Sequence, residues 1–338
     1  MLNTMQIGKQ ISQLRKAKGL TGEKLAAALD VSPQAVSKWV NGKCLPETAL
    51  LPSLAKELGC SVDALFMGYN ADELKIVMDL YESADEDKRI AREPLEFIRS
   101  KNIISRYLKN DAMEIADVGG ATGAYSFWLA EMGHRVHLLD LVQKHVDIAK
   151  QRGVEKNLPL ASYEVADARS LPYKDESMDI VLLMGALYHL QDRNDRIKCL
   201  TEARRVLKPN GVMLCTVISR YSALFGYYKY GHIDAINVRI IDESIQQGKY
   251  SNPRGFANAY FHLPNEISSE VLDARFADIQ MIAVQGFANA YTPESYMDDE
   301  YKLTQMLRHI EMTETMPELL CTSKNIMVAG VKRRFGNE

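Results

Sequence analysis

The chain has 338 residues, of which 46% are apolar and 25% charged, a composition typical of a folded protein with room for two domains. It contains no apolar run of about 18 residues and no apolar core followed by a small-residue cleavage site near the N-terminus, so we expect a cytoplasmic protein without a membrane span. The five cysteines include no C-x-x-C pair, which argues against a disulfide framework or a metal site.

Charge is unevenly distributed along the chain. Residues 1–68 hold eight Lys or Arg and five Asp or Glu, a net charge of +3, which leaves −6 for the rest. A basic segment ahead of an acidic one is typical of a small nucleic-acid-binding module joined to another domain. The excess is modest and does not decide the function by itself.

Residues 1–68 predict a compact all-α unit of five short helices. Apolar residues recur at helical spacing from residue 7, and Gly19 marks the end of the first helix. Thr21 and Ser32 are suited to cap the next two helices, and Pro33 occupies the first helical position of the second of these. Segments 48–59 and 61–66 predict the last two helices.

Within this unit, the stretch LRKAKGLTGEKLAAALDVSPQAVSKWVNGKCLPETALLPSLAKELGCSVDALF resembles the phage-repressor-like (XRE) helix-turn-helix family, over residues 7–67. The resemblance implies that the helix beginning at Pro33 enters the major groove of double-stranded DNA, and we expect a homodimer on a two-fold site. The implied DNA contacts are Gln34, Ser37 and Lys38 at base edges, and Asn41 and Lys43 at phosphates.

Two positions depart from this family. Gly22 stands where a phosphate-clamping Gln is usual, which should weaken DNA binding, and Val40 stands where Glu is usual, which leaves an apolar spot for a partner. The alternative interpretation is a helical bundle that now serves only for dimerisation.

Residues 69–92 predict a linker and a helix, and from residue 93 strands alternate with helices. Strands that are apolar throughout and separated by helices predict a doubly wound α/β domain with helices on both faces of the sheet. We therefore expect domains at 1–68 and 93–338, with the linker between them. The predicted strands are residues 113–119, 134–140, 161–168, 178–185, 211–219, 278–287 and 325–333.

The first of these strands ends in DVGGATG, residues 117–123. Small residues in such a turn let the backbone approach a bound nucleotide closely. The second strand ends in Asp140, about 17 residues after the turn, where a carboxylate can accept hydrogen bonds from both hydroxyls of a ribose. The chain lacks the G-x-G-x-x-G turn that a dehydrogenase usually has.

This order of motifs resembles a class I S-adenosylmethionine (SAM) methyltransferase over about residues 81–333, with Ala121 where Gly is commoner. The resemblance implies SAM as cofactor and a Rossmann-like sheet of seven strands, the last an antiparallel edge strand. The implied cofactor contacts are Asp117, Gly119, Gly120, Ala121 and Gly123 around the methionine part, Asp140 and Leu141 at the ribose, Asp167 and Ala168 at the adenine, and Met184 and Gly185 under the sulfonium.

The resemblance also implies that the helix within 69–92 closes over the cofactor. Tyr81 and Arg89 would then contact SAM; the alternative is a linker helix with solvated charges.

His189, in GALYHL after the fourth strand, is the leading candidate for the base that a hydroxyl or protonated amine acceptor needs. A structural hydrogen bond is the alternative role for this side chain. Tyr188 beside it is expected to shape the pocket at the reacting methyl group.

Residues 219–263 are too long for a simple crossover helix and hold nine aromatic residues. An insertion here resembles the caps that small-molecule methyltransferases build over the acceptor, and aromatic walls suit an organic substrate. The predicted acceptor contacts are Arg220, Tyr228, Tyr260 and His262. A helical packing layer is the alternative.

The sequence thus favours a SAM-dependent methyltransferase that acts on a small organic molecule by O- or N-methylation and carries a DNA-binding domain. The alternative is a transcription regulator whose methyltransferase-like domain senses SAM or a metabolite. A nucleic-acid methyltransferase is disfavoured, because no [DNS]-P-P-[YFW] segment follows the fourth strand and no Cys follows a Pro.

Overall fold

The computed structural model of the protein describes residues 4–58, 93–252, 258–291 and 294–333. The chain divides into two compact units, residues 1–75 and 76–338, and each is described by itself. The division falls inside the segment predicted as a linker. Tyr81, Arg89 and the predicted helix at 61–66 lie outside the described residues.

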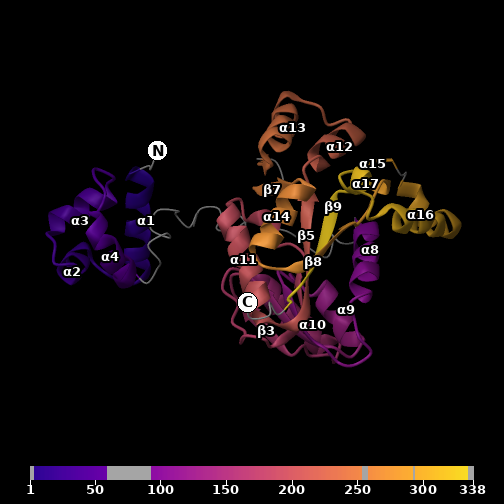
Figure 1. Ribbon diagram of the computed structural model, residues 1–338, viewed down its shortest axis with the longest axis horizontal. Coiled ribbons are helices and arrows are strands. Elements are labelled where there is room, and N and C mark those ends of the chain that lie inside the picture. The colour runs from indigo at the N-terminus through magenta and orange to yellow at the C-terminus, as the bar shows by residue number, and fades with distance from the viewer. Residues whose placement is uncertain (1–3, 59–92, 253–257, 292–293, 334–338) are drawn as a thin grey trace. The chain divides into compact units, whose positions relative to one another are not determined.

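The N-terminal unit is helical over its described residues, as the sequence predicts (Figure 1). The side-chain oxygen of Thr21 accepts a hydrogen bond from the backbone of Lys24 at 3.1 Å, and that of Ser32 accepts one from Ala35 at 3.2 Å, so both predicted caps are confirmed. Its elements are α1 (Thr4–Ala17), α2 (Gly22–Ala28), α3 (Pro33–Val40), the 3-10 helix η1 (Thr48–Leu50) and α4 (Leu51–Leu58).

Apolar side chains from α1, α2, α3 and α4 meet in one core. Ile11, Leu25 and Leu54 are fully buried there, and Trp39 is 5% exposed. At Gly8, an added Cβ would lie 2.3 Å from the carbonyl oxygen of Trp39, so glycine allows α1 and α3 to approach closely.

The second unit is built on a mixed sheet. Strands β3, β2, β1, β4 and β5 lie side by side in that order and are parallel. The strands are β1 (Glu114–Val118), β2 (Arg135–Asp140), β3 (Ser162–Val165), β4 (Met178–Leu183), β5 (Leu207–Ser219), β6 (Lys249–Tyr250), β7 (Ala259–His262), β8 (Ala277–Ala283) and β9 (Asn325–Val331).

Helices cover both faces of this sheet, which confirms the predicted α/β class (Figure 1). Apolar residues of α11 and α14 pack on one face, and those of α8, α9 and α10 pack on the other. These helices are α8 (Pro94–Ser105), α9 (Ala124–Glu131), α10 (Gln143–Glu155), α11 (Arg193–Val206) and α14 (Pro264–Asp273).

The last strand differs from the prediction in its place in the sheet. β9 is antiparallel, as expected, but it lies between β5 and β8 and is not an edge strand. Its residues are buried from Asn325 to Gly330, whereas those of β8 alternate between half-buried and exposed over Ala277–Met281. Burial on both faces is the pattern of an internal strand, so β8 takes the outer position beside it.

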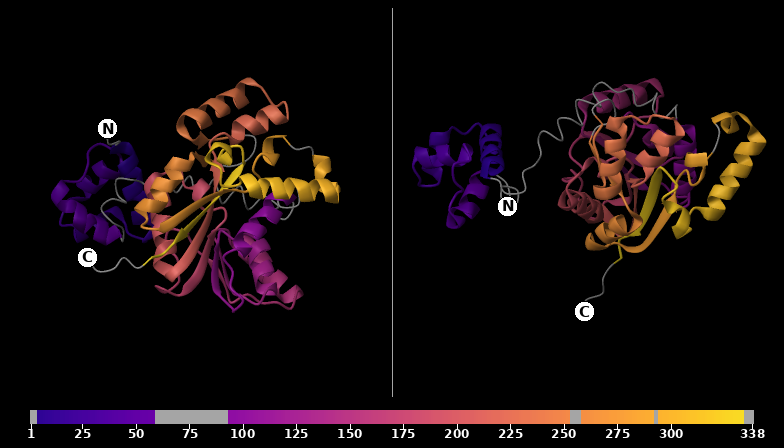
Figure 2. Two further views of the ribbon diagram at one scale, coloured as in Figure 1. Left: turned by 45° about the vertical axis from the view of Figure 1, so that its right-hand side comes forward. Right: turned by 90° about the horizontal axis from the view of Figure 1, so that it is seen from above.

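The segment predicted as a cap contains α12 (Ser222–Lys229), α13 (Ala235–Gln247), β6 and β7. The two helices lie together beyond the end of β5 (Figures 1 and 2). β7 pairs in parallel with the end of β5, where Ile218 faces Phe261, so the cap is attached to the sheet by hydrogen bonds.

After β8 the chain forms α15 (Ala288–Tyr291), the 3-10 helix η3 (Glu294–Asp298), α16 (Glu300–Thr313) and α17 (Pro317–Leu320), which Figure 2 shows near α8. None of the described helices combines the length and apolar character that crossing a bilayer requires. Across the described ranges, no group of three His, Cys, Asp or Glu side chains could hold a metal ion.

Candidate active site

The turn after β1 has the backbone geometry of a tight ligand-binding loop. Gly119, Ala121 and Gly123 all have positive φ angles, of 75°, 47° and 90°. A Cβ on Gly123 would lie 2.8 Å from the ring of Phe127. Glycine fits such positions without strain, whereas Ala121 adopts a conformation that L-residues rarely take, so surrounding contacts must hold this turn.

Asp140, at the end of β2, supplies that contact. Its Oδ2 accepts a hydrogen bond from the backbone of Ala121 at 2.9 Å, and its Oδ1 accepts one from Val142 at 2.9 Å. His145 lies 3.2 Å from the same carboxylate. The predicted ribose ligand therefore also connects the ends of β1 and β2. Leu141 follows it and is half-buried.

Asp117 is fully buried beneath the same turn. Ser126 donates a hydrogen bond to its Oδ2 at 2.6 Å, while Oδ1 has no partner among the described residues. Burial raises the pKa of this carboxyl to about 6, and the charge of Asp140 adds to that effect. A Cβ on Gly120 would lie 2.9 Å from the Asp117 carboxyl carbon, so only glycine lets the backbone at residue 120 lie this close to that carboxyl group. A buried acceptor beside a small-residue turn fits an ammonium group of a ligand.

The segment after β3 presents Asp167 and Ala168. Burial alone would raise the pKa of Asp167, but the bonds from the Arg169 guanidinium and backbone outweigh it and lower that pKa. Arg169 also pairs with Asp195 at 2.5 Å. Ala168 packs against the apolar core on the face of the sheet that α11 and α14 cover. The carboxylate of Asp167 is therefore held by Arg169, and its contact with an adenine stays a prediction.

The turns after β1 and β4 lie next to each other. A Cβ on Gly119 would lie 3.6 Å from the backbone nitrogen of Ala186, and one on Gly185 would lie 3.2 Å from the Tyr188 hydroxyl. Thr216 donates to the carbonyl of Met184 at 2.7 Å, which attaches this turn to β5. The predicted cofactor residues in the turns after β1, β2 and β4 therefore lie together at the carboxyl ends of adjacent strands, where doubly wound sheets bind ligands.

A pocket of about 410 Å³ begins at Tyr188 and extends under the cap. Ser222, Ala223 and Gly226 of α12 form part of its wall. Its aromatic members are Tyr188, Tyr227, Tyr230, Tyr250 and Phe261, and its polar members include Glu93, Glu96, His232, Lys324 and Asn325. The cap thus builds an aromatic cavity next to the turn after β4.

The predicted acceptor residues lie elsewhere. Arg220 is 4% exposed and donates to the carbonyl of Phe261 at 2.8 Å, with Glu266 as its ion-pair partner. His262 is fully buried, 3.3 Å from Glu270, and burial lowers its pKa. Neither side chain lines the pocket, and both contact residues of the body from inside the cap, so their contact with an acceptor stays a prediction.

Two further predicted side chains also lie off the pocket wall. Tyr260 packs against the Arg196 guanidinium at 3.9 Å from its ring centre, and Tyr228 is 63% exposed outside the lining. Sequence reasoning missed Glu93, Glu96 and Lys324, because nothing in the sequence brings the start of α8 beside the start of β9.

His189 ends the short 3-10 helix η2 (Leu187–His189), with its ring centre 4.6 Å from that of Tyr188. Tyr188 lines the pocket, and His189 is absent from the lining. The role of His189 as base stays a prediction.

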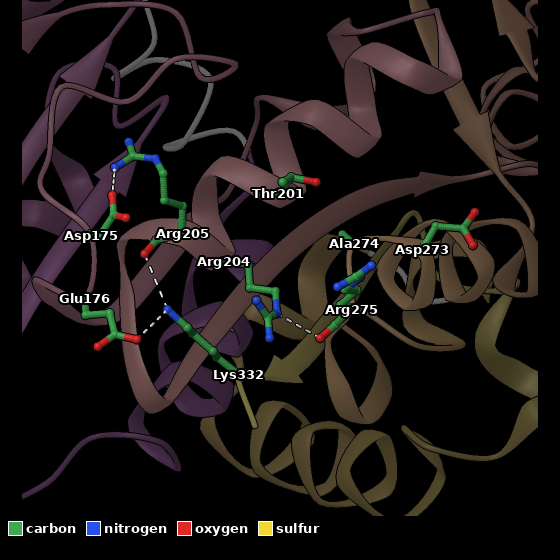
Figure 3. A pocket seen from close by; sticks show the side chains of 9 residues that line it. All are labelled: Asp175, Glu176, Thr201, Arg204, Arg205, Asp273, Ala274, Arg275 and Lys332. Carbon is green, nitrogen blue, oxygen red and sulfur yellow. Dashed lines mark hydrogen bonds and ion pairs between the residues drawn. The ribbon is translucent and has the colours of Figure 1, made fainter. Parts of the chain in front are cut away.

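A second, larger hollow of about 700 Å³ lies at the opposite end of the sheet, where β4 and β5 begin (Figure 3). Arg205 pairs there with Asp175 at 2.7 Å, and Lys332 pairs with Glu176 at 3.3 Å. Arg204 donates to the carbonyl of Arg275 at 2.9 Å. These three basic side chains therefore already have partners within the protein. The hollow is also remote from the turns that carry the candidate site.

In the N-terminal unit, the predicted DNA contacts are exposed. Gln34, Ser37 and Lys38 project from α3, and Lys43 follows it. Asn41, also exposed, donates to the carbonyl of Ser37 at 2.8 Å and so closes the end of the helix. Val40 packs partly against the core of this unit. That packing explains why the residue at this position is apolar, and no partner protein is needed to explain it.

Residues 116–215 match the family model of a methyltransferase domain, and residues 11–65 match that of a helix-turn-helix. Over 136 residues, the chain is 32% identical to a ubiquinone/menaquinone biosynthesis C-methyltransferase of Acidiphilium cryptum. The matched segment covers 38% of this chain and 53% of that protein. Over 105 residues it is 32% identical to a probable tRNA methyltransferase 9B of Bos taurus, covering 30% of this chain and 21% of that protein.

Among solved structures, a SAM-dependent methyltransferase of Thermotoga maritima, described as a possible histamine N-methyltransferase, is similar with a TM-score of 0.49 and 16% identity. The match covers 76% of this chain and 100% of that one. The chain spans about half the length of the first relative and about a fifth of the second. Residues 116–215 are therefore similar to methyltransferase domains and residues 11–65 to helix-turn-helix domains, the two families that the sequence resembles.

Proposed function

We propose that the protein transfers the methyl group of SAM to a small organic molecule, by O- or N-methylation, and that its N-terminal unit binds double-stranded DNA. The observation that carries the proposal is the aromatic pocket under the cap, which begins at Tyr188 beside the turns after β1 and β4. An acceptor in that pocket would lie next to a cofactor bound at the two turns.

The residues at the carboxyl ends of β1 and β2 fit SAM. Gly119, Gly120 and Gly123 leave room for close backbone approach, and Asp140 stands at the end of β2 where a ribose would lie. The buried Oδ1 of Asp117 suits the amino group of the methionine part. Bound there, SAM supplies an activated methyl group. The chain contributes mainly orientation of the acceptor toward it.

The acceptor is proposed to be small because the pocket is small and the unit that contains it is acidic. Residues outside 1–68 carry a net charge of −6, whereas a nucleic-acid substrate favours a basic surface. The two relatives are named for a quinone pathway and for tRNA, so their names alone do not select an acceptor.

A second candidate is a transcription regulator whose methyltransferase domain senses SAM or a metabolite. The helix-turn-helix domain favours it, with Gln34 and Lys38 exposed for a major groove. SAM would then have to change the affinity for DNA, because a ligand shifts an equilibrium only by binding two states differently. A homodimer on a two-fold DNA site would suit either candidate.

The test is a transfer assay with methyl-labelled SAM and a cell extract separated into small-molecule, protein and nucleic-acid fractions. Label in the small-molecule fraction, lost in an Asp140→Ala variant, supports the proposal. Label in nucleic acid overturns it. No label in any fraction, with SAM still bound in calorimetry, supports the regulator.

DNA binding is tested separately by footprinting on the chain's own promoter region and on unrelated promoters. We expect protection of a two-fold site that is lost in Gln34→Ala and retained in Glu23→Ala, an exposed change on the neighbouring helix α2. Absence of any sequence preference would contradict a regulatory role.

A further inference from the structure

Asn325, the first residue of β9, lines the aromatic pocket and brings a carboxamide group to its wall. The residue is only 5% exposed, and its Oδ1 is buried without a hydrogen-bond partner among the described residues. Its Nδ2 likewise makes no hydrogen bond to any residue of the described ranges. Buried polar atoms are nearly always hydrogen-bonded, so an unsatisfied amide in a pocket wall indicates a ligand contact.

The backbone of Asn325, by contrast, is held on both sides. Its N–H donates to Oε1 of Gln285 at 3.0 Å. Its carbonyl accepts one hydrogen bond from the Ser323 hydroxyl at 2.7 Å and another from the backbone of Val284 at 3.0 Å. The side chain therefore projects from a fixed point on a strand, which suits a group that has to orient a ligand.

The sheet directs this side chain toward the pocket. Asn325 pairs with Ile218 of β5, and Ile218 pairs in turn with Phe261 of β7. Paired residues on neighbouring strands project from the same face of a sheet, and all three residues line the pocket. The three side chains therefore form one row across the sheet, in which Asn325 is the polar member.

The rest of the wall is largely aromatic. Tyr250 stacks on Phe261 with 4.7 Å between ring centres and 13° between ring planes. The other aromatic side chains of the lining are Tyr188, Tyr227 and Tyr230. The cavity of about 410 Å³ has the size of a site for a small organic ligand, and rings pack well against rings in offset or tilted contacts. The wall therefore favours an aromatic ligand.

The amide of Asn325 selects the polar group that such a ligand carries. A carboxamide offers an acceptor at Oδ1 and a donor at Nδ2, and a half turn of the group exchanges the two atoms at nearly unchanged shape. A hydroxyl matches both atoms, because one oxygen donates a hydrogen and also accepts one. An ether oxygen only accepts and would leave Oδ1 unsatisfied, and a hydrocarbon would leave both amide atoms unsatisfied.

We propose, resting on the methyl transfer proposed above, that the acceptor is a phenol, an aromatic molecule whose hydroxyl group binds to the Asn325 amide. The aromatic wall selects the ring, and Asn325 determines the specificity for the hydroxyl. In the absence of a ligand, the buried Oδ1 costs stability, because it has lost water and gained no donor.

The test uses three probes with the same ring system: 2-naphthol, 2-methoxynaphthalene and 2-methylnaphthalene. Binding to the full chain at neutral pH, with S-adenosylhomocysteine present, is measured by calorimetry. We expect 2-naphthol to bind at least about tenfold tighter than either of the others, because its hydroxyl alone can satisfy Oδ1. Equal binding of the three probes, or tightest binding of the ether, would overturn the proposal.

Two variants remove the amide and keep the backbone hydrogen bonds of the strand. In Asn325→Leu, the preference for 2-naphthol over the ether should fall to about threefold or less. Asn325→Ala should lose the preference as well, so the result does not depend on how one replacement packs. Asn102→Leu, the same exchange at an exposed position of α8, is the matched control and should leave the preference unchanged.

Stability and cofactor binding separate this role from a structural one. The free energy of unfolding of Asn325→Leu should be no lower than that of the wild type, and its affinity for S-adenosylhomocysteine should be unchanged. A destabilised Asn325→Leu, or a preference that both variants retain, would overturn the role of Asn325. Failure of the wild type to bind SAM would instead overturn the proposed function, whichever probe the pocket prefers.

Discussion

Two aspartates beneath the turn after β1 differ in what they contact. Asp140 accepts hydrogen bonds from the backbone of Ala121 and Val142, and these donors stabilise its charged carboxylate. Asp117 accepts one from Ser126 and keeps Oδ1 without a partner among the described residues. The first carboxylate therefore stabilises the turn, and the second costs stability when it is charged.

This difference predicts a pH effect on stability. The pKa of Asp117 rises from its ordinary value of 3.8 to about 6 in the folded protein, so the folded state binds this proton more tightly than the unfolded chain does. The resulting contribution to stability is fully present below about pH 3.8 and is lost as the pH rises through 6. Its size is about 3 kcal/mol.

The measurement is the free energy of unfolding from urea titrations between pH 4.5 and 7.5. Asp117→Asn should gain stability relative to the wild type as the pH rises across this range. Asp147→Asn, an exposed change on α10, is the control and should track the wild type. A constant difference between Asp117→Asn and the wild type would contradict the raised pKa.

Removing Asp140 should weaken cofactor binding through the turn. In Asp140→Ala, the backbone amides of Ala121 and Val142 lose their acceptor, and the positive φ of Ala121 loses its support. We expect the affinity for SAM to fall at least about tenfold, which corresponds to 1.4 kcal/mol. Calorimetric titration with SAM measures it, with Asp147→Ala as control; unchanged affinity would show that Asp140 does not serve the site.

At the scale of elements, the cap contacts a buried ion pair of the body. Arg196 of α11 and Glu270 of α14 lie 2.7 Å apart, both almost fully buried, and His262 of β7 contacts the same carboxylate. Desolvation would raise the pKa of Glu270, but bonds from His262 and Arg196 lower it to about 2. Breaking such a pair leaves one charge uncompensated inside the protein.

Arg220→Ala tests how the cap is attached. Its guanidinium donates to the Phe261 carbonyl and pairs with Glu266, so its loss leaves an acceptor and a carboxylate without this partner. We expect the free energy of unfolding to fall by about 3 kcal/mol. Arg239→Ala is the matched control, because Arg239 is 81% exposed and pairs with Glu243 one turn later on α13. Its loss should leave the free energy of unfolding close to the wild-type value, because exposed ion pairs contribute little.

The same experiment separates the cap from the cofactor site. SAM should still bind to Arg220→Ala, since the turns after β1 and β4 do not contact this arginine in any described interaction. Binding of an acceptor in the pocket should weaken, because Phe261 and Tyr250 form part of the pocket wall. An equal loss of stability in the two arginine variants would contradict the role assigned to Arg220.

Elements were predicted well where their signals are local. The signals for the caps at Thr21 and Ser32 and for the Gly-rich turn lie in a few adjacent residues. The structure confirms the caps and shows positive φ angles in the turn. The place of β9 was predicted wrongly, because the partners of a strand are set by contacts with β5 and β8 far away in the chain.

The pocket shows the same limit. Apart from Tyr188, its aromatic rings come from one segment whose composition predicted a cap, but its carboxylates come from the start of α8 and its ammonium from the start of β9. Arg220 and His262 were expected at the acceptor because they are polar and near the rings in sequence. Their side chains turn inward instead, where Glu266 and Glu270 compensate their charge or polarity.

At the scale of the whole molecule, each unit has its own apolar core. Leu54 belongs to the N-terminal core and Ile180 to that of the sheet, and both are fully buried. Leu54→Ala should destabilise the N-terminal unit by about 2–5 kcal/mol and abolish DNA binding. SAM affinity should stay at the wild-type value, and Ile180→Ala should show the converse. Loss of SAM binding in Leu54→Ala would contradict two independent cores.

The internal position of β9 also sets an order of events during translation. The described part of the N-terminal unit is complete at Leu58, whereas the sheet lacks the strand between β5 and β8 until residues 325–331 have left the ribosome. At about 5–20 residues per second, that delay is tens of seconds at the slower rate. The nascent chain can therefore present a folded helical unit while one edge of its growing sheet is still open.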